Sequence, residues 1–117
     1  KFYGLVLQDK PIEPIVKLVD MFYWDLNYEI VILTSRPEYC RKDTDDWLFD
    51  KSITYNELTM RPKDNHDKNW KVKEIKKLRV ERRILYILED NPAEIEKFQN
   101  QGWNVIPIRS NNYEGGI

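Results

Sequence analysis

The feature that most constrains the fold is a near-continuous run of apolar, largely β-branched residues at Tyr28–Thr34 (Tyr-Glu-Ile-Val-Ile-Leu-Thr). A strand with one face in water alternates apolar and polar residues, whereas a run of this kind is typical of a strand buried on both faces. Ile84–Leu88 is a second such run. Asn104–Ile108 is a shorter third, in which Pro107 indicates a strand end or an edge. These runs therefore favour a parallel sheet.

Segments of helical character separate the predicted strands. The predicted helices are Pro11–Leu26, Arg41–Phe49, Asn69–Leu78 and Pro92–Gln101. In all but the second, apolar residues recur at helical spacing, and Gly102 follows the last one, where a helix usually ends. A polar loop, Arg61–Asn69, precedes the third helix. This alternation predicts an α/β fold, although Lys1–Gln8 fits a strand and a helical turn equally well.

Length and composition narrow the class of protein. The 117 residues, of 14.2 kDa, are enough for one domain, which we place at 1–117. A net charge of −1 excludes the strongly basic profile of domains that bind the nucleic-acid backbone over a broad surface. No apolar run approaches the roughly 18 residues that cross a membrane. The single cysteine, Cys40, cannot form an internal disulfide, so we expect a cytoplasmic protein. The chain starts at Lys1 rather than Met, which suggests a fragment.

Polar residues follow the first buried run directly, as Thr34, Ser35 and Arg36. In open α/β sheets, ligands bind beyond the carboxyl ends of the strands, so these side chains are candidates for binding. The two hydroxyl groups suit a phosphate oxygen, and an arginine donates two hydrogen bonds to the same group. The plain alternative is an ordinary turn in which Arg36 pairs with an acidic surface residue.

Two carboxylates, Glu89 and Asp90, follow the second buried run. Mg²⁺ prefers oxygen ligands and often takes one or two carboxylates together with substrate phosphate and water, so this pair is a candidate metal site. An alternative is that Asp90 and Asn91 cap the next helix, which Pro92 at its first position would suit. The two roles are compatible.

Five lysines lie between the polar loop and the end of the third predicted helix: Lys68, Lys71, Lys73, Lys76 and Lys77. A run of this kind is usually a solvated helix face, and composition alone singles out none of them. The four glycines are scattered, which excludes a glycine-rich phosphate loop within these residues.

Three segments, in order, resemble the haloacid dehalogenase-like (HAD) phosphohydrolases. "IVILTSRPE" is similar to the family's second motif, an apolar strand that ends in Thr34, and "MRPKDNHDKNWKVKEI" to the stretch that carries its third, a lysine entering a helix. Lys73 matches that lysine best and Lys71 is second. "ILYILEDNPAEI" is similar to the fourth motif, a strand followed by two acids. The closest pattern is that of the 3′-phosphatase domains of phage-type polynucleotide kinases.

The resemblance implies a Rossmann-like three-layer HAD core with a central parallel sheet. It also implies a Mg²⁺-dependent phosphatase in which an aspartate attacks phosphorus and an aspartyl-phosphate is then hydrolysed. Thr34 and Lys73 would be catalytic, Ser35 and Arg36 would bind substrate, and Asp90 with Glu89 would hold the metal. The implied substrate is a phosphorylated small molecule, a nucleotide or a nucleic-acid end, with no membrane partner.

The family's first motif, Asp-x-Asp-x-Thr at the end of the first strand, is absent. Asp9 is the only N-terminal candidate for the nucleophile, but Lys10 and Pro11 follow it rather than a second aspartate and a threonine. We therefore expect the N-terminal strand, with its nucleophile, to be missing. The alternative function is a catalytically inactive HAD-like binding or scaffold module, for which four tryptophans and seven tyrosines could supply a surface.

Overall fold

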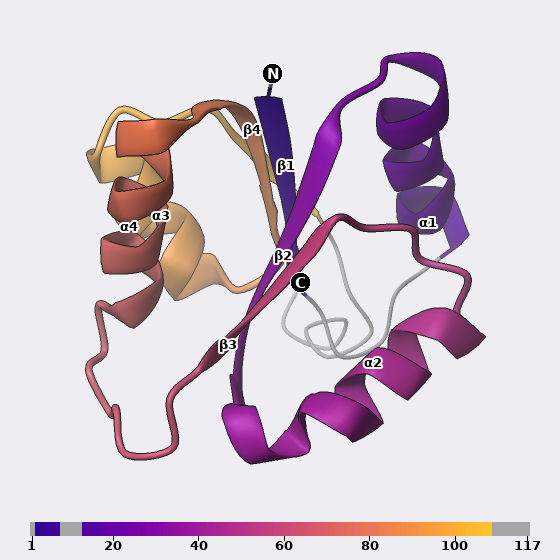
Figure 1. Cartoon of the computed structure of the whole chain (residues 1–117). Coiled ribbons are helices and arrows are strands. Elements are labelled where there is room, and N and C mark those ends of the chain that lie inside the picture. The colour runs from indigo at the N-terminus through magenta and orange to yellow at the C-terminus, as the bar shows by residue number, and fades with distance from the viewer. Residues whose placement is uncertain (1, 8–12, 109–117) are drawn as a thin grey trace.

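The chain folds into a five-stranded, wholly parallel sheet with the strand order β3-β2-β1-β4-β5 and helices on both faces (Figure 1). The computed structural model describes residues 2–7 and 13–108. The strands are β1 (Phe2–Leu7), β2 (Glu29–Pro37), β3 (Glu57–Arg61), β4 (Arg83–Glu89) and β5 (Val105–Pro107). The helices are α1 (Glu13–Asp20), α2 (Arg41–Asp50), α3 (Trp70–Glu81) and α4 (Pro92–Asn100).

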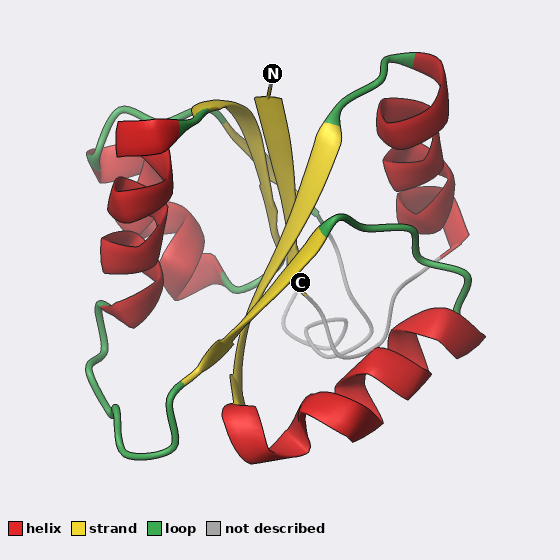
Figure 2. Cartoon of the chain, in the orientation of Figure 1, coloured by secondary structure: helices red, strands yellow, loops and turns green. Residues whose placement is uncertain are grey.

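Two apolar clusters, one on each face of the sheet, form the core. Successive residues of a strand point to opposite faces, so Ile30 and Ile32 of β2 pack with α1 and α2 while Val31 and Leu33 pack with α3 and α4. Figure 2 shows the result, with one pair of helices on each side of the strands. The predicted three-layer α/β architecture is confirmed, and the burial of β2 on both faces explains its near-continuous apolar sequence.

The middle position of the sheet belongs to β1, which pairs with β2 on one side and β4 on the other. The sequence of this segment did not distinguish a strand from a helical turn, and we expected the N-terminal strand to be missing. The structure corrects that expectation, because residues 2–7 form a strand that precedes α1 and β2. Leu7 is the partner of Glu89, so β1 ends at the same edge of the sheet as β4.

The edge strand β3 was not predicted. Its sequence, Glu-Leu-Thr-Met-Arg, is short and mixed, and only Met60 is fully buried, so its apolar signal is weak. Asn56, just before it, accepts a hydrogen bond from the Ile30 N–H at 2.7 Å and donates its own N–H to the Ile30 carbonyl at 2.8 Å. Long-range pairing of this kind sets the strand, and a local pattern does not reveal it.

The predicted helices are present, with shifted ends. The first was predicted at Pro11–Leu26; the structure has α1 at Glu13–Asp20, continued by a π-helical turn at Met21–Asp25, and residues 8–12 lie outside the described part. The third, α3, runs three residues past its predicted end at Leu78. In the described ranges, no helix combines the length and apolar character that crossing a membrane requires.

Candidate functional site

Polar side chains from β2 and β4 gather at the carboxyl edge of the sheet. The two strands are parallel and only β1 lies between them, which places their ends about 10 Å apart. Thr34, Ser35 and Arg36 occupy the end of β2, and Glu89 and Asp90 the end of β4. The sequence predicted that these groups lie at one edge of the sheet. The parallel strand topology places them there.

At the end of β2, the pairing of the strand with β3 becomes irregular. The Thr34 hydroxyl accepts a hydrogen bond from the Arg36 N–H at 3.2 Å, and Ser35 is exposed. The half-buried Arg36 guanidinium has no ion-pair partner among the described residues, so the acidic surface partner of the plain alternative is not seen there. Two hydroxyl groups and an unpaired cation at one strand end are suited to an anion.

A small cavity lies beside the end of β2, between β2 and α2. Thr34 and Arg36 line it together with Thr44, Trp47 and three aliphatic residues, and it has room, about 20 Å³, for a single water molecule. The Thr44 hydroxyl is buried without a hydrogen-bond partner in the described structure.

At the end of β4, Glu89 is fully buried. Its Oε2 accepts hydrogen bonds from the N–H groups of Asp90, at 3.1 Å, and Asn91, at 3.0 Å. Its Oε1 has no hydrogen-bond partner among the described groups and lies 3.6 Å from the Lys71 Nζ. Burial raises the pKa of Glu89 to about 7, against the lowering effect of the Lys71 ammonium, and the adjacent Asp90 carboxyl adds to the rise.

Asp90 and Asn91 divide the roles that the sequence left open. The Asn91 side chain caps α4 by accepting a hydrogen bond from the Ala93 N–H at 2.9 Å, and Pro92 occupies the first turn. Asp90 is almost fully buried beside Glu89 and is not needed as the cap. Its carboxyl group interacts with that of Glu89 at the strand end.

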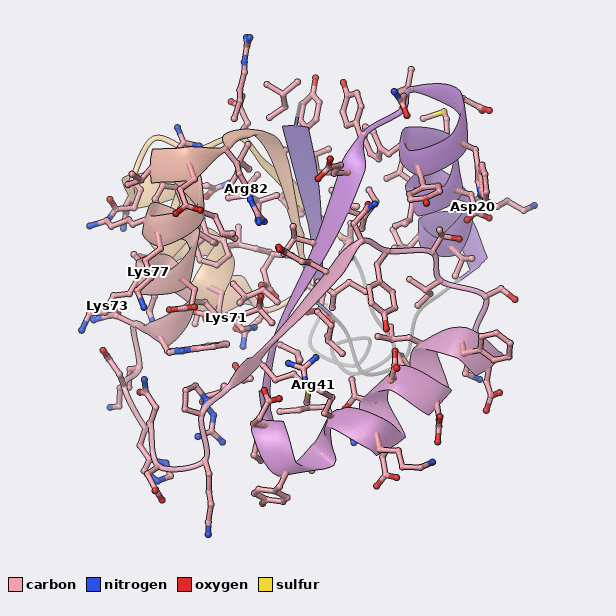
Figure 3. All side chains as sticks on the ribbon, in the orientation of Figure 1. Asp20, Arg41, Lys71, Lys73, Lys77 and Arg82 are labelled. Atoms are coloured by element: carbon pink, nitrogen blue, oxygen red, sulfur yellow. The ribbon has the colours of Figure 1, made fainter. Side chains whose placement is uncertain are left out.

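The lysine nearest to these carboxylates is Lys71, not Lys73. Lys71 is buried and points from α3 toward the sheet, where it pairs with Glu89 (Figure 3). Lys73 is exposed, points away from the sheet and forms an ion pair with Asp67 on the preceding loop. The structure thus brings Lys71, the second-best match to the family's lysine, into the site. Lys73, the best match, lies on the outer surface of the protein.

The donor set at the end of β4 fits Mg²⁺. Within 2–7 and 13–108 there is no cluster of three or more His, Cys, Asp or Glu side chains able to hold a metal ion. Glu89 and Asp90 nevertheless supply two adjacent carboxyl groups, and one oxygen of Glu89 has no hydrogen-bond partner among the described groups. Mg²⁺ commonly binds one or two protein carboxylates and completes its shell with water and phosphate, so the pair matches the number of protein ligands that it takes.

Comparisons with known proteins agree with the fold. A family model for the polynucleotide kinase PNKP phosphatase domain matches residues 3–113. A solved structure of the Pnkp1/Rnl/Hen1 RNA repair complex contains a chain that superposes with a TM-score of 0.76 at 17% identity, and a second structure of the Pnkp1/Rnl/Hen1 complex gives 0.74 at 16%. Both alignments cover 92% of this chain but only 42% and 45% of the other. No curated protein sequence matches significantly.

Proposed function

Because the chain belongs to the polynucleotide kinase PNKP phosphatase domain family, we propose that it is a Mg²⁺-dependent phosphate-ester hydrolase acting through an aspartyl-phosphate. The observation that carries the proposal is the placement of Thr34–Arg36, Lys71 and the Glu89–Asp90 pair around one edge of the sheet. Hydroxyls, cations and carboxylates in such an arrangement are what phosphoryl transfer needs, since its catalysis is mainly positioning and charge stabilisation.

The phosphate is held from the β2 side. The hydroxyls of Thr34 and Ser35 donate hydrogen bonds to its oxygens. The Arg36 guanidinium, which has no ion-pair partner among the described residues, balances its charge. Lys71 approaches from α3 and takes the role of catalytic lysine, which the family resemblance had given to Lys73. Its buried ammonium acts where the effective dielectric is low, so it stabilises negative charge more strongly than an exposed lysine would.

Asp90 and Glu89 would hold the metal. Asp90 would be the direct ligand. Glu89 would contribute its Oε1, which has no hydrogen-bond partner among the described groups, or would position Asp90 through the backbone N–H groups that bond to its Oε2. Mg²⁺ bound there supplies positive charge that offsets the repulsion between an attacking carboxylate and the phosphate. The elevated pKa of Glu89 suits this role, because a bound cation replaces the proton that the carboxyl otherwise retains.

The proposed reaction needs a carboxylate nucleophile at the end of β1, beside the end of β4. Leu7, at the end of β1, is the partner of Glu89, and in the sequence Asp9 is the only acidic residue between Leu7 and Glu13. We assign the nucleophile to Asp9 on this sequence position alone. Its carboxylate would attack phosphorus and expel the alcohol, and water would then hydrolyse the acyl phosphate to phosphate and the free carboxylate.

The proposed substrates are nucleotide or polynucleotide 3′-phosphates. The name of the matching family and the RNA repair complexes of the similar structures support a nucleic-acid end over an unrelated phosphorylated small molecule. We place the protein in the cytoplasm, in keeping with its single free cysteine.

A second candidate function is an inactive binding or scaffold module. The absence of an Asp-x-Asp-x-Thr sequence favours it, because the second aspartate and the threonine have no counterpart after Asp9. Such a module would bind a phosphorylated end through Thr34–Arg36 without hydrolysing it.

Release of inorganic phosphate from a 3′-phosphorylated oligonucleotide distinguishes the two functions. We expect Mg²⁺-dependent release that EDTA abolishes and that Asp90→Ala and Asp9→Asn each eliminate. Glu96→Ala, an exposed carboxylate on α4, is the matched control and should retain full activity. Undiminished turnover by Asp90→Ala at saturating Mg²⁺ would refute the metal assignment. Binding of the oligonucleotide by the wild-type chain without any release would establish the module instead.

A further inference from the structure

The ladder between β2 and β3 is interrupted where the candidate phosphate-binding residues lie. Thr34 is the partner of Met60, but the next paired positions are Pro37 and Arg61. Three steps along β2 therefore match one step along β3, and Ser35 and Arg36 have no partner on the neighbouring strand. Bulges of this kind are common beside active sites because they re-aim side chains, but they also leave backbone groups that the sheet does not hold.

Arg61, at the end of β3, bonds to the backbone of this bulge. Its Nε donates a hydrogen bond to the Ser35 carbonyl at 2.9 Å. Its Nη1 donates to the Asn65 carbonyl at 2.6 Å, with a longer contact to the Pro62 carbonyl at 3.4 Å. No carboxylate of the described residues pairs with Arg61. Its N–H groups instead donate to backbone carbonyls of β2 and of the loop that follows β3.

The loop that Arg61 holds leads directly to the site lysine. The Asn65 side chain accepts a hydrogen bond from the Asp67 N–H at 3.0 Å, and the Asp67 carbonyl accepts one from Trp70, the first residue of α3, at 3.1 Å. Lys71 follows next in the chain. A short series of hydrogen bonds therefore runs from the Ser35 carbonyl through Arg61 to the start of α3.

We propose that Arg61 is a positioning residue, whose guanidinium fixes the Ser35–Arg36 bulge relative to the loop that carries α3 and Lys71. The fork of N–H groups on a guanidinium has a fixed geometry, so it can set the distance between two backbone segments. A lysine at the same position offers one point charge and cannot reach both carbonyls in that way. The relevance to phosphate rests on the proposed function, but the link between bulge and loop does not.

The link is tested first in the free protein. In ¹H–¹⁵N spectra of Arg61→Ala and Arg61→Lys, we expect the amide signals of Ser35, Arg36 and Asn65 to shift or broaden. Arg83→Ala, an exposed arginine at the opposite end of a strand, is the control and should leave those signals in place. Unchanged Ser35 and Arg36 signals in a folded Arg61→Ala would overturn the proposal whether or not the protein is an enzyme.

The consequence for the site is tested with inorganic phosphate and with the 3′-phosphorylated oligonucleotide. Misplacement of a binding group by about 1 Å costs on the order of 100-fold, so we expect that loss in kcat/KM, and weaker phosphate binding, for Arg61→Ala. Millimolar guanidinium should restore part of the activity of Arg61→Ala but not of Arg61→Lys, whose side chain occupies the space. Full activity of Arg61→Ala, or a loss that only follows its thermal stability and resists rescue, would overturn the positioning role. A wild-type chain that binds phosphate, with an affinity that falls in Arg61→Ala, but hydrolyses no ester would refute the proposed function and support the role of Arg61.

Discussion

Lys71 and Lys73 are two residues apart on α3, yet their ammonium groups lie in opposite environments. Two residues correspond to about 200° around a helix, so one side chain faces the sheet when the other faces water. Lys71 pairs with the buried Glu89, whereas Lys73 pairs with Asp67 at the surface. Surface pairs of that kind contribute at most about 1 kcal/mol to folding stability. Removal of one partner of a buried pair is strongly destabilising, because it leaves an uncompensated buried charge.

From this contrast we expect Lys71→Met to lower kcat by at least about 100-fold, as the loss of a buried charge-stabilising group does in other sites. Lys73→Met should leave kcat and KM unchanged. Phosphate release from the 3′-phosphorylated oligonucleotide measures both, and a thermal scan of each variant separates loss of catalysis from loss of folding. The reverse ranking of the two variants would restore the assignment to Lys73.

Glu89 makes stability depend on pH in a defined direction. Its pKa rises from the ordinary value of 4.5 to about 7 in the folded protein, so the folded state holds this proton more tightly than the unfolded chain. Its contribution to the free energy of unfolding is therefore complete below pH 4.5 and is lost as pH rises through 7, on the order of 3 kcal/mol in total.

We expect urea unfolding of the wild type without Mg²⁺ to show that decline between pH 5 and pH 8, and Glu89→Gln to lack it. Glu81→Gln, the same change at an exposed position, should follow the wild type. Mg²⁺ should reduce the decline in the wild type, because it favours the ionised carboxyl. Parallel pH profiles for the wild type and Glu89→Gln would contradict the assignment.

At the scale of the elements, α4 shows how the local sequence determines where a helix begins and where it ends. Asn91 caps its first turn, and Gly102 follows its last with a φ of +80°, a conformation that residues with a Cβ rarely adopt. No atom lies within 4 Å of a Cβ added at Gly102, so the position is open in space and only the backbone opposes a side chain.

Gly102→Ala should therefore destabilise the protein by about 1 kcal/mol, the usual cost of the left-handed conformation for an L-residue. Asn100→Ala, on the exposed last turn of the same helix, serves as the control and should not destabilise. Urea midpoints at constant slope measure both changes. Equal stability of Gly102→Ala and the wild type would show that the turn can re-form without positive φ.

At the scale of the whole molecule, the sheet is shared by two apolar clusters. Ile75 on α3 and Leu48 on α2 belong to clusters on opposite faces, and both clusters include residues of β2 and β4. Because the same strands complete both clusters, the two faces should unfold together in one transition.

We expect Ile75→Ala, which empties a fully buried position, to cost 2–5 kcal/mol by the usual range, and Val80→Ala on the exposed side of the same helix to cost less than about 0.5 kcal/mol. Leu48→Ala should lower the same transition from the other face. Far-UV circular dichroism and tryptophan fluorescence, followed in urea, should give coincident curves for every variant. Separate transitions for the two probes would show that the faces unfold independently.

Sequence alone determined the elements that carry a strong apolar pattern. The apolar runs of β2 and β4, the helical spacing of α3 and α4, and the polar groups that follow each buried strand are all readable, because periodicity reports how many faces of a segment are covered. From them came the α/β fold with a parallel sheet and the candidate residues Thr34, Ser35, Arg36, Glu89 and Asp90, whereas the three-layer core was implied by the family resemblance.

Only the tertiary structure decided what depends on neighbours far along the chain. The edge strand β3 and the central place of β1 arise from pairing between strands, which leaves little trace in a short mixed segment. The choice of Lys71 over Lys73 depends on how α3 rotates against the sheet, and the bulge held by Arg61 depends on the register of β3 beside β2. A local sequence pattern indicates how buried a residue is on average. It does not indicate which residue lies next to it, because packing and strand register decide that.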